Sequence, residues 1–207
     1  MTNSIFFEPG NHKAEGLTHS PFKALIAPRP LGWVSSQSQT GIANLGAYSF
    51  FNAVSELPPM VMFAAAPDRR ADKTGHKDSW QNIQDTKEFG LNIVGADLLE
   101  KMIKSSEPVA PDIDEFAYAR LTKIYGKYIS APLVGEAAAH LECTLFDTLQ
   151  LPGTETKGGV RLVFGTVVGI HIRTDIIKDG KVDNTAFRQA SRLGYRHYAI
   201  IDKMIER

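Results

Sequence analysis

The chain has 207 residues, of which 43% are hydrophobic and 22% charged, so it can bury an ordinary core and is not a disordered chain. Its 23 basic and 23 acidic residues balance, and no basic stripe occurs, which argues against a nucleic-acid partner. The single cysteine, Cys143, excludes an internal disulfide and a cysteine-based zinc site, and we expect it in the core.

The strand signals start after residues 1–20, which are polar and irregular and are expected to form a surface arm. Apolar and β-branched runs separated by turn residues predict strands. The polar, glycine-containing segment QSQTG between the first two predicts a hairpin turn. The predicted strands are Leu31–Ser36, Ile42–Leu45, Tyr48–Val54, Met60–Ala66, Phe89–Val94, Ala137–Gln150 and Val160–Arg173.

Three segments have helical signals. Asp78–Thr86 is predicted to begin with Asp78 as a capping residue, Ala96–Ser105 has apolar side chains at helical spacing, and Asn184–Leu193 is followed by a glycine. Between them, Pro108–Tyr118 is predicted to be a loop with one helical turn. Many strands, few helices and no regular alternation exclude a doubly wound sheet and favour a mainly β fold, a closed antiparallel β-barrel with α insertions.

No segment of the sequence predicts membrane insertion. The N-terminus lacks the basic and apolar regions of a signal peptide, and the longest apolar run, Met60–Ala66, is far shorter than a bilayer span. We therefore expect a soluble cytoplasmic protein formed by one domain over residues 1–207, without a membrane partner. The glycine motifs of Rossmann and Walker phosphate sites do not occur either.

The stretch NLGAYSFFNAVSELPP, from Asn44 to Pro59, interleaves three aromatic rings with asparagines and serines. Rings cover the flat face of a ligand, and amides match the donor and acceptor edge of a heterocycle. Taken singly, each of these residues is explained as a core or turn residue. The joint pattern indicates a ligand that is flat and has a polar edge.

The second informative stretch is DRRADKTGHKDSWQN, residues 68–82, which gathers cations ahead of the predicted helix. They are Arg69, Arg70, Lys73, His76 and Lys77. The helix N-terminus already carries partial positive charge, so a lysine there is unfavourable unless an anion lies between them. A phosphate held by Lys77 and Ser79 would resolve this conflict. The alternative is a solvated loop whose cations are balanced by neighbouring aspartates.

Both stretches resemble the flavin reductase-like family of FMN-binding split β-barrels. The resemblance rests on PRPLGWVSSQSQTGIANLGAYSFFNAVSELPPMVMF and KDSWQNIQDTKEFGLNIV, which match the family in order and spacing over about 65 residues. Weaker matches follow at VFGTVVGIHI, DGKVD and RLGYRHYA, so that the resemblance covers most of the chain.

The resemblance implies a Greek-key antiparallel split barrel that forms homodimers, with FMN near the dimer interface. It implies that bound FMN carries the chemistry of an oxidoreductase, with NAD(P)H or a small redox protein as electron donor and no metal. The implied cofactor-binding residues are Trp33, Val34, Ser35, Ser36, Asn44, Ser49, Phe50, Phe51, Asn52, Lys77, Ser79 and Asn82. Arg192 and Tyr198 are implied at the open side of the pocket, where substrate enters.

The chain departs from the family pattern at one informative position. Related short flavin reductases often carry Gly-Asp-His, associated with nicotinamide binding, where this chain has Gly158, Gly159 and Val160. A non-catalytic FMN-binding electron-transfer protein is therefore the alternative to a flavin reductase. A metal hydrolase is disfavoured because the six histidines show no metal-ligand spacing, and haem in the same barrel is a further alternative.

Overall fold

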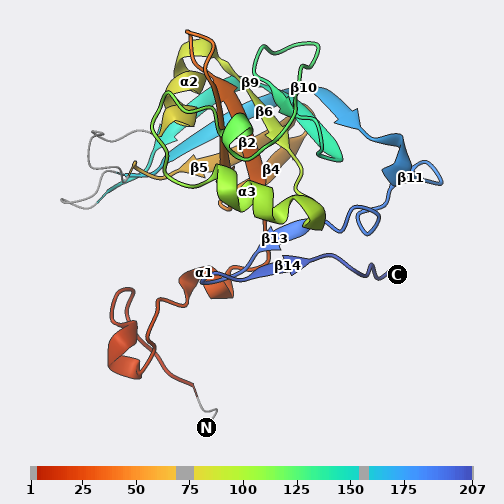
Figure 1. Ribbon diagram of the computed structural model, residues 1–207. Helices are drawn as coiled ribbons and strands as arrows, with labels where there is room; N and C mark the ends of the chain where they lie inside the picture. The colour runs from red at the N-terminus through yellow and green to blue at the C-terminus, as the bar shows by residue number, and fades with distance from the viewer. Residues whose placement is uncertain (1–3, 69–76, 154–158, 207) are drawn as a thin grey trace.

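The long strands pair into one seven-stranded antiparallel sheet in a computed structural model that describes residues 4–68, 77–153 and 159–206 (Figure 1). The strand order is β3-β2-β6-β9-β10-β5-β4. This order is not a simple meander, because β5 and β6 are separated by β9 and β10, and it confirms the predicted antiparallel β architecture. The strands are β2 Gly32–Gln37, β3 Ala43–Tyr48, β4 Phe51–Glu56, β5 Pro59–Ala65, β6 Glu88–Asn92, β9 Ala139–Gln150 and β10 Arg161–Ile172.

Shorter elements complete the fold. A three-stranded sheet with the order β1-β13-β14 lies below the large sheet in Figure 1. Its strands are β1 Arg29–Pro30, β13 Ala190–Arg192 and β14 Tyr198–Ile200, and two small pairs are β7 Lys123–Ile124 with β8 Leu133–Val134 and β11 Ile177–Lys178 with β12 Lys181–Val182. The helices are η1 His12–Glu15, α1 Phe22–Leu25, α2 Asp78–Thr86, η2 Ala96–Leu98, α3 Leu99–Ser105, α4 Glu115–Tyr118 and η3 Thr174–Ile176.

The large sheet is curled, so that its two edges approach one another. Strands β3 and β4 stand at opposite ends of the strand order, yet only Ser49 and Phe50 separate them in sequence. Across the curl, β3 contacts β5, and β4 contacts β1. Residues 4–21, which precede α1, extend away from this body in Figure 1.

Helices cover the edge strand β3. Strand β3 contacts α2, α3 and α4, and α2 also packs on β2. The core forms two main clusters, one around Trp33, Leu45 and Phe116 next to these helices, and one around Phe63 and Phe89 within the curl. Cys143 is fully buried in the second cluster, which confirms the core role expected for it.

Four sequence predictions are wrong in detail. The barrel expected to be closed is a curled sheet that is open between its edge strands β3 and β4. The strand predicted over Tyr48–Val54 is two strands, because the chain turns at Ser49 and Phe50 and the halves join opposite edges of the sheet. The helix α2 has its predicted bounds, but Lys77 rather than Asp78 is its N-cap residue, and the Lys77 side chain forms no capping hydrogen bond.

No helix forms over Asn184–Leu193, where the structure has turns followed by strand β13. The Asp183 carboxylate accepts the N–H and hydroxyl of Thr185, at 2.9 and 2.6 Å, a pattern that turns and helix starts share, and the Ala186 N–H closes a turn on the Asp183 carbonyl at 3.1 Å. Arg188 has a left-handed φ of 49°, and Ala190 donates its N–H to Val94. Local turn bonds and tertiary pairing therefore override the helical pattern.

Within the described ranges, no helix is long and apolar enough to cross a membrane. The same residues include no group of three or more His, Cys, Asp or Glu side chains placed to hold a metal ion.

A buried carboxylate fixes the loop between β7 and β8 to the sheet. Glu142 of β9 is fully buried and accepts the N–H groups of Lys127, Tyr128 and Ile129 at 3.0, 2.6 and 3.0 Å. A fourth partner is His171, whose Nε2 lies 2.6 Å from Glu142 Oε1. Burial alone would raise the pKa of Glu142, but these donors together lower it to about 2.

The structure therefore predicts that Glu142→Gln lowers the free energy of unfolding at pH 7 by about 1.5–3 kcal/mol, the range for hydrogen bonds to a charged group. Because the folded pKa is depressed, the contribution of Glu142 is present above its unfolded pKa of 4.5 and is lost as the pH falls toward about 2. Urea denaturation at pH 7 and at pH 3 measures both effects. Asp147→Asn, at an exposed position of the same strand, is the control, and equal losses in the two variants would contradict the prediction.

Candidate functional site

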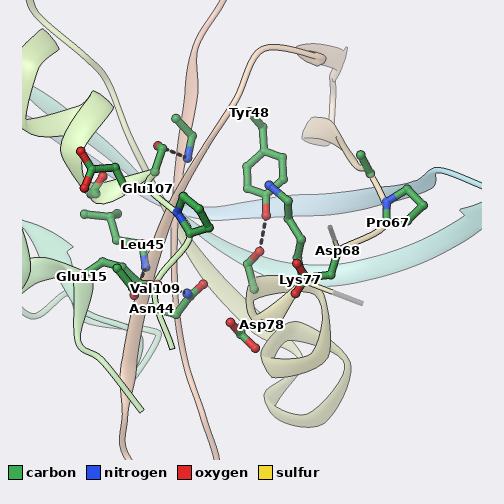
Figure 2. A pocket seen from close by; sticks show the side chains of 17 residues that line it. Asn44, Leu45, Tyr48, Pro67, Asp68, Lys77, Asp78, Glu107, Val109 and Glu115 are labelled. Carbon is green, nitrogen blue, oxygen red and sulfur yellow. Dashed lines mark hydrogen bonds between the residues drawn. The ribbon is translucent and has the colours of Figure 1, made fainter. Parts of the chain in front are cut away.

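A cavity of about 650 Å³ lies between the edge strand β3, the start of α2 and the segment from Ser105 to Glu115. This size is in the range of pockets that hold small molecules and cofactors. Figure 2 shows Lys77 and Tyr48 on one side of it and Glu107 and Glu115 on the other. We call it the central cavity, and its lining residues are Asn44–Tyr48, Ala66–Asp68, Lys77–Ser79, Ser105–Val109 and Glu115.

The backbone of β3 supplies polar groups to this cavity. The N–H groups of Leu45 and Ala47 point away from β2, since they donate to Glu115 Oε2 at 3.1 Å and to Ser106 Oγ at 3.2 Å. In an antiparallel ladder the N–H and C=O of one residue point to the same side. The carbonyl oxygens of Leu45 and Ala47 therefore also face the cavity side, as acceptors for a ligand with N–H groups.

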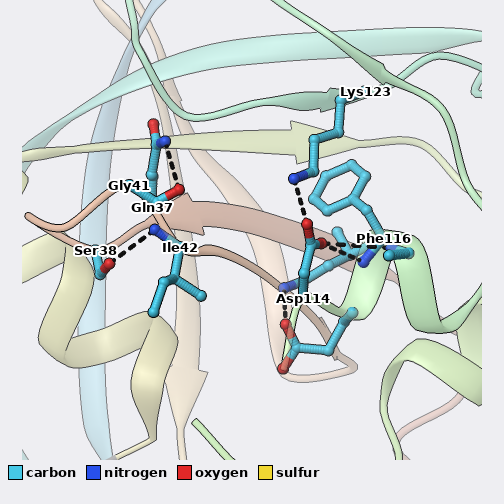
Figure 3. A network of polar contacts seen from close by, with 10 residues as sticks. Gln37, Ser38, Gly41, Ile42, Asp114, Phe116 and Lys123 are labelled. Atoms are coloured by element: carbon cyan, nitrogen blue, oxygen red, sulfur yellow. Dashed lines mark hydrogen bonds and ion pairs between the residues drawn. The ribbon is translucent and has the colours of Figure 1, made fainter. Parts of the chain in front are cut away.

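Glu115 is held in the cavity wall by the short helix α4, whose first turn is capped by Asp114 (Figure 3). Asp114 accepts the N–H groups of Phe116 and Ala117 at 3.0 and 3.4 Å and pairs with Lys123. Glu115 itself is 7% exposed, and its Oε1 accepts the Asn44 amide at 2.8 Å. Burial raises the pKa of Glu115 to about 7, despite the N–H donors that lower it.

Asn44 is fixed in orientation by a chain of hydrogen bonds through the wall. Its amide nitrogen donates to Glu115, and its oxygen accepts from Ser36 Oγ at 3.4 Å. Ser36 in turn accepts from Asn82 Nδ2 of α2 at 3.2 Å. Helix α2, β2, β3 and α4 thus contribute to one network behind the cavity.

The start of α2 forms the other end of the central cavity. The first N–H groups of a helix have no acceptor within it, and the N-terminus favours an anion. The Lys77 ammonium lies 5.2 Å from the centre of the Tyr48 ring. Ser79 is almost fully buried, and its hydroxyl is hydrogen-bonded to that of Tyr48. Burial raises the pKa of Tyr48 to about 12, so this tyrosine is neutral.

A second cavity of about 470 Å³ adjoins the first and is rich in cations. The two share Ala47, Ser106, Glu107 and Pro108. We call the second the cationic cavity, because its lining includes Lys23, Arg29 and Arg192 with the one described carboxylate Glu107. The central cavity has the opposite balance in the described part of the chain, where Asp68, Asp78, Glu107 and Glu115 accompany Lys77.

The structure divides the residues that the sequence singled out among several places. Asn44, Lys77 and Ser79 line the central cavity, and Ser49, Arg192 and Tyr198 line the cationic cavity. Ser36 and Asn82 stand behind Asn44. Trp33, Val34 and Ser35 are fully buried, Phe50 lies in the bend, and Phe51 and Asn52 lie on β4. Arg69, Arg70, Lys73 and His76 lie outside the described residues.

Trp33 lies one layer behind the central cavity. Its indole N–H donates to Ser105 Oγ at 2.9 Å, and Ser105 lines the cavity. Sequence reasoning missed Glu107, Glu115, Ser105 and Ser106, which reach the site from segments far from the aromatic motif. The one sequence signal near Glu115 is the adjacent Asp114, a residue type that often caps helices. This signal predicts that a helix starts there, but it does not predict that Glu115 lines a cavity.

Comparison with known proteins decides the family. Residues 25–191 match the model of the flavin reductase like domain. The chain belongs to the flavin reductase-like family. An uncharacterised protein of Aquifex aeolicus is 35% identical over 175 residues, which cover 84% of this chain and 85% of the relative.

Solved structures place this flavin reductase-like protein among the split barrels. Nitrilotriacetate monooxygenase component B from Bacillus cereus superposes with a TM-score of 0.86 at 28% identity, over 99% of this chain and 100% of that one. A Shewanella frigidimarina structure described as having a split barrel domain gives a TM-score of 0.79 at 21% identity, over 98% of each chain. The split-barrel fold implied by the sequence motifs is confirmed.

The raised pKa of Glu115 makes the stability of this flavin reductase-like protein depend on pH. Ionised Glu115 is disfavoured only in the folded state, so its contribution to the free energy of unfolding declines as pH rises from 4.5 to above about 7. In wild type the free energy of unfolding should fall by about 3 kcal/mol over that pH range because of Glu115, and Glu115→Gln should abolish this fall. Urea denaturation at pH 5, 7 and 8.5 measures it. Glu107→Gln, which changes an exposed carboxyl of the same cavity, should keep the wild-type slope, and an unchanged slope in Glu115→Gln would refute the assignment.

Proposed function

We propose that this protein is an FMN-dependent oxidoreductase of the flavin reductase type. The observation that carries the proposal is the central cavity, which combines the backbone acceptors of β3 with an anion-favouring helix start. A flavin has a flat ring with a polar edge and, as FMN, a terminal phosphate. The acceptors of β3 therefore fit the N–H of the ring edge, and the N–H groups at the start of α2 fit the phosphate.

Each side chain has a defined task in this proposal. Asn44, oriented by Ser36 and Glu115, presents its amide to the ring edge. Lys77 and the first turn of α2 hold the phosphate, and Ser79 keeps Tyr48 in place beside them. Bound FMN supplies the redox chemistry, and the protein supplies position, electrostatics and access. NADH or NADPH is the proposed donor, in a cytoplasmic homodimer.

A second candidate is an FMN-binding electron-transfer protein without its own turnover. One observation favours it, namely Gly158, Gly159 and Val160 at the position where related reductases carry Gly-Asp-His. Both candidates require the same cofactor, so the first experiment is the visible spectrum of the purified protein and identification of the compound that acid releases. A colourless protein that also fails to take up added FMN would refute both.

Reduction by a nicotinamide electron donor distinguishes the reductase from the electron-transfer protein. Under the reductase proposal, anaerobic mixing of FMN-loaded protein with excess NADH or NADPH should bleach the flavin absorption within seconds. Bleaching by dithionite alone would instead support the electron-transfer protein. Reduction of free FMN by the same nicotinamides, without protein, is the control for background reaction.

The phosphate assignment predicts a specific effect of Lys77→Ala. Loss of a charge-assisted hydrogen bond should weaken FMN binding by about 1.5–3 kcal/mol and leave the binding of riboflavin, which has no phosphate, unchanged. Titration followed by flavin fluorescence measures both affinities. Lys181→Ala, on the distant strand β12, is the control variant. Equal FMN affinity in Lys77→Ala and wild type would remove Lys77 from the phosphate site.

A further inference from the structure

The cationic cavity is lined by three positive side chains that form no ion pair with a carboxylate of the described residues. Arg29 and Arg192 are directly opposite in the register of β1 and β13, and Lys23 comes from α1 beside them. In the described part of the chain, none of the three lies within ion-pair distance of a carboxylate. Like charges directly opposite one another across a strand pair are destabilising.

Arg29 is the most constrained of the three. It is 6% exposed, and its terminal nitrogens donate to the carbonyls of Lys23 and Ile26 at 2.5 Å and of Leu193 at 2.9 Å. Its Nε is buried and has no hydrogen-bond acceptor among the described residues. Burial and then the charge of Arg192 lower the pKa of Arg29. A buried cation without a counter-charge is costly, and an anion would offset that cost.

Aromatic rings accompany these cations. The Arg192 guanidinium lies 4.4 Å from the centre of the Tyr198 ring, and Tyr195 lines the same cavity. Lys23 and Arg29 both lie over the Phe50 ring, at 5.7 and 5.8 Å from its centre. The remaining charge is Glu107, whose carboxylate accepts the Tyr118 hydroxyl at 2.5 Å. Positive charge beside aromatic faces suits a planar molecule with an anionic substituent.

We propose that the cationic cavity binds an acidic aromatic molecule, with its carboxylate or phosphate at Arg29 and Arg192, as the second reactant beside the flavin. The binding itself rests on the geometry of this cavity, and the role as a reactant rests on the proposed function. The cavity shares Ala47, Ser106, Glu107 and Pro108 with the central cavity, so a ligand there adjoins the proposed flavin site.

Calorimetric titration of the full chain, flavin-free and FMN-loaded, with three small probes tests this. Benzoate should bind at least about tenfold more tightly than benzamide, which has the same ring without the charge. Phenyl phosphate shows whether the site prefers a phosphate to a carboxylate. Because the flavin-free protein is also titrated, a failure of the FMN proposal leaves this result interpretable.

Arg192→Gln is the diagnostic variant, because it removes one cation of the opposed pair. It should bring benzoate affinity to that of benzamide and should also leave the thermal midpoint of the ligand-free protein unchanged or raise it, since the repulsion is gone. A merely structural arginine would lower that midpoint. Lys23→Gln, on an exposed residue, should weaken benzoate binding as well, whereas Arg173→Gln, outside the cavity and paired with Asp175, should not.

Two results would overturn the proposal. The first is equal affinity of wild-type protein for benzoate and benzamide. The second has two parts. Benzoate competes with FMN for the wild-type protein, and Arg192→Gln loses the preference for FMN over riboflavin while Lys77→Ala keeps it. That pattern would assign the cationic cavity to the phosphate of the cofactor. Retention of the FMN preference in Arg192→Gln, with loss of benzoate binding, supports the proposal.

Discussion

The two residues that join β3 to β4 impose the main constraint on this molecule. A flat seven-stranded sheet would separate its edge strands by about 29 Å, at about 4.8 Å between neighbours. The chain from Tyr48 to Phe51 can span only about 11 Å. Because β3 and β4 occupy the two edges, the sheet has to curl until they approach. The half-barrel therefore follows from connectivity, and its packed interior adds stability to a shape already imposed.

The same constraint explains why the site lies where it does. Curling leaves β3 as an edge strand beside the helices, with ladder groups that no neighbouring strand can pair. Glu115 of α4 and Ser106, the residue after α3, accept the N–H groups of Leu45 and Ala47, while the carbonyls stay directed to the cavity side. The exposed edge of β3, which could otherwise pair with another chain, thus forms one polar side of the central cavity.

Local patterns predicted most strands, the bounds of α2 and the family, because these depend on alternation, capping and contiguous motifs. They failed where distant pairing decides the outcome. Nothing local shows that Ser49 and Phe50 separate two edges of a sheet, or that Ala190–Arg192 pairs with β1 instead of continuing a helix. Glu115 and the opposition of Arg29 to Arg192 are likewise invisible in sequence, since each depends on contacts between segments at least 70 residues apart.

The carboxylate of Glu142 has a consequence for how this sequence can change. A Cβ atom at Gly126 would lie 2.4 Å from its carboxyl group, and one at Gly169 would lie 2.9 Å from its Oε1. The loop backbone and strand β10 can therefore approach the acid only where both positions lack a side chain. A shorter residue at 142 would relax both restrictions at once, but it would leave three N–H groups without an acceptor. These three positions form one epistatic unit, in which the effect of any substitution depends on the other two.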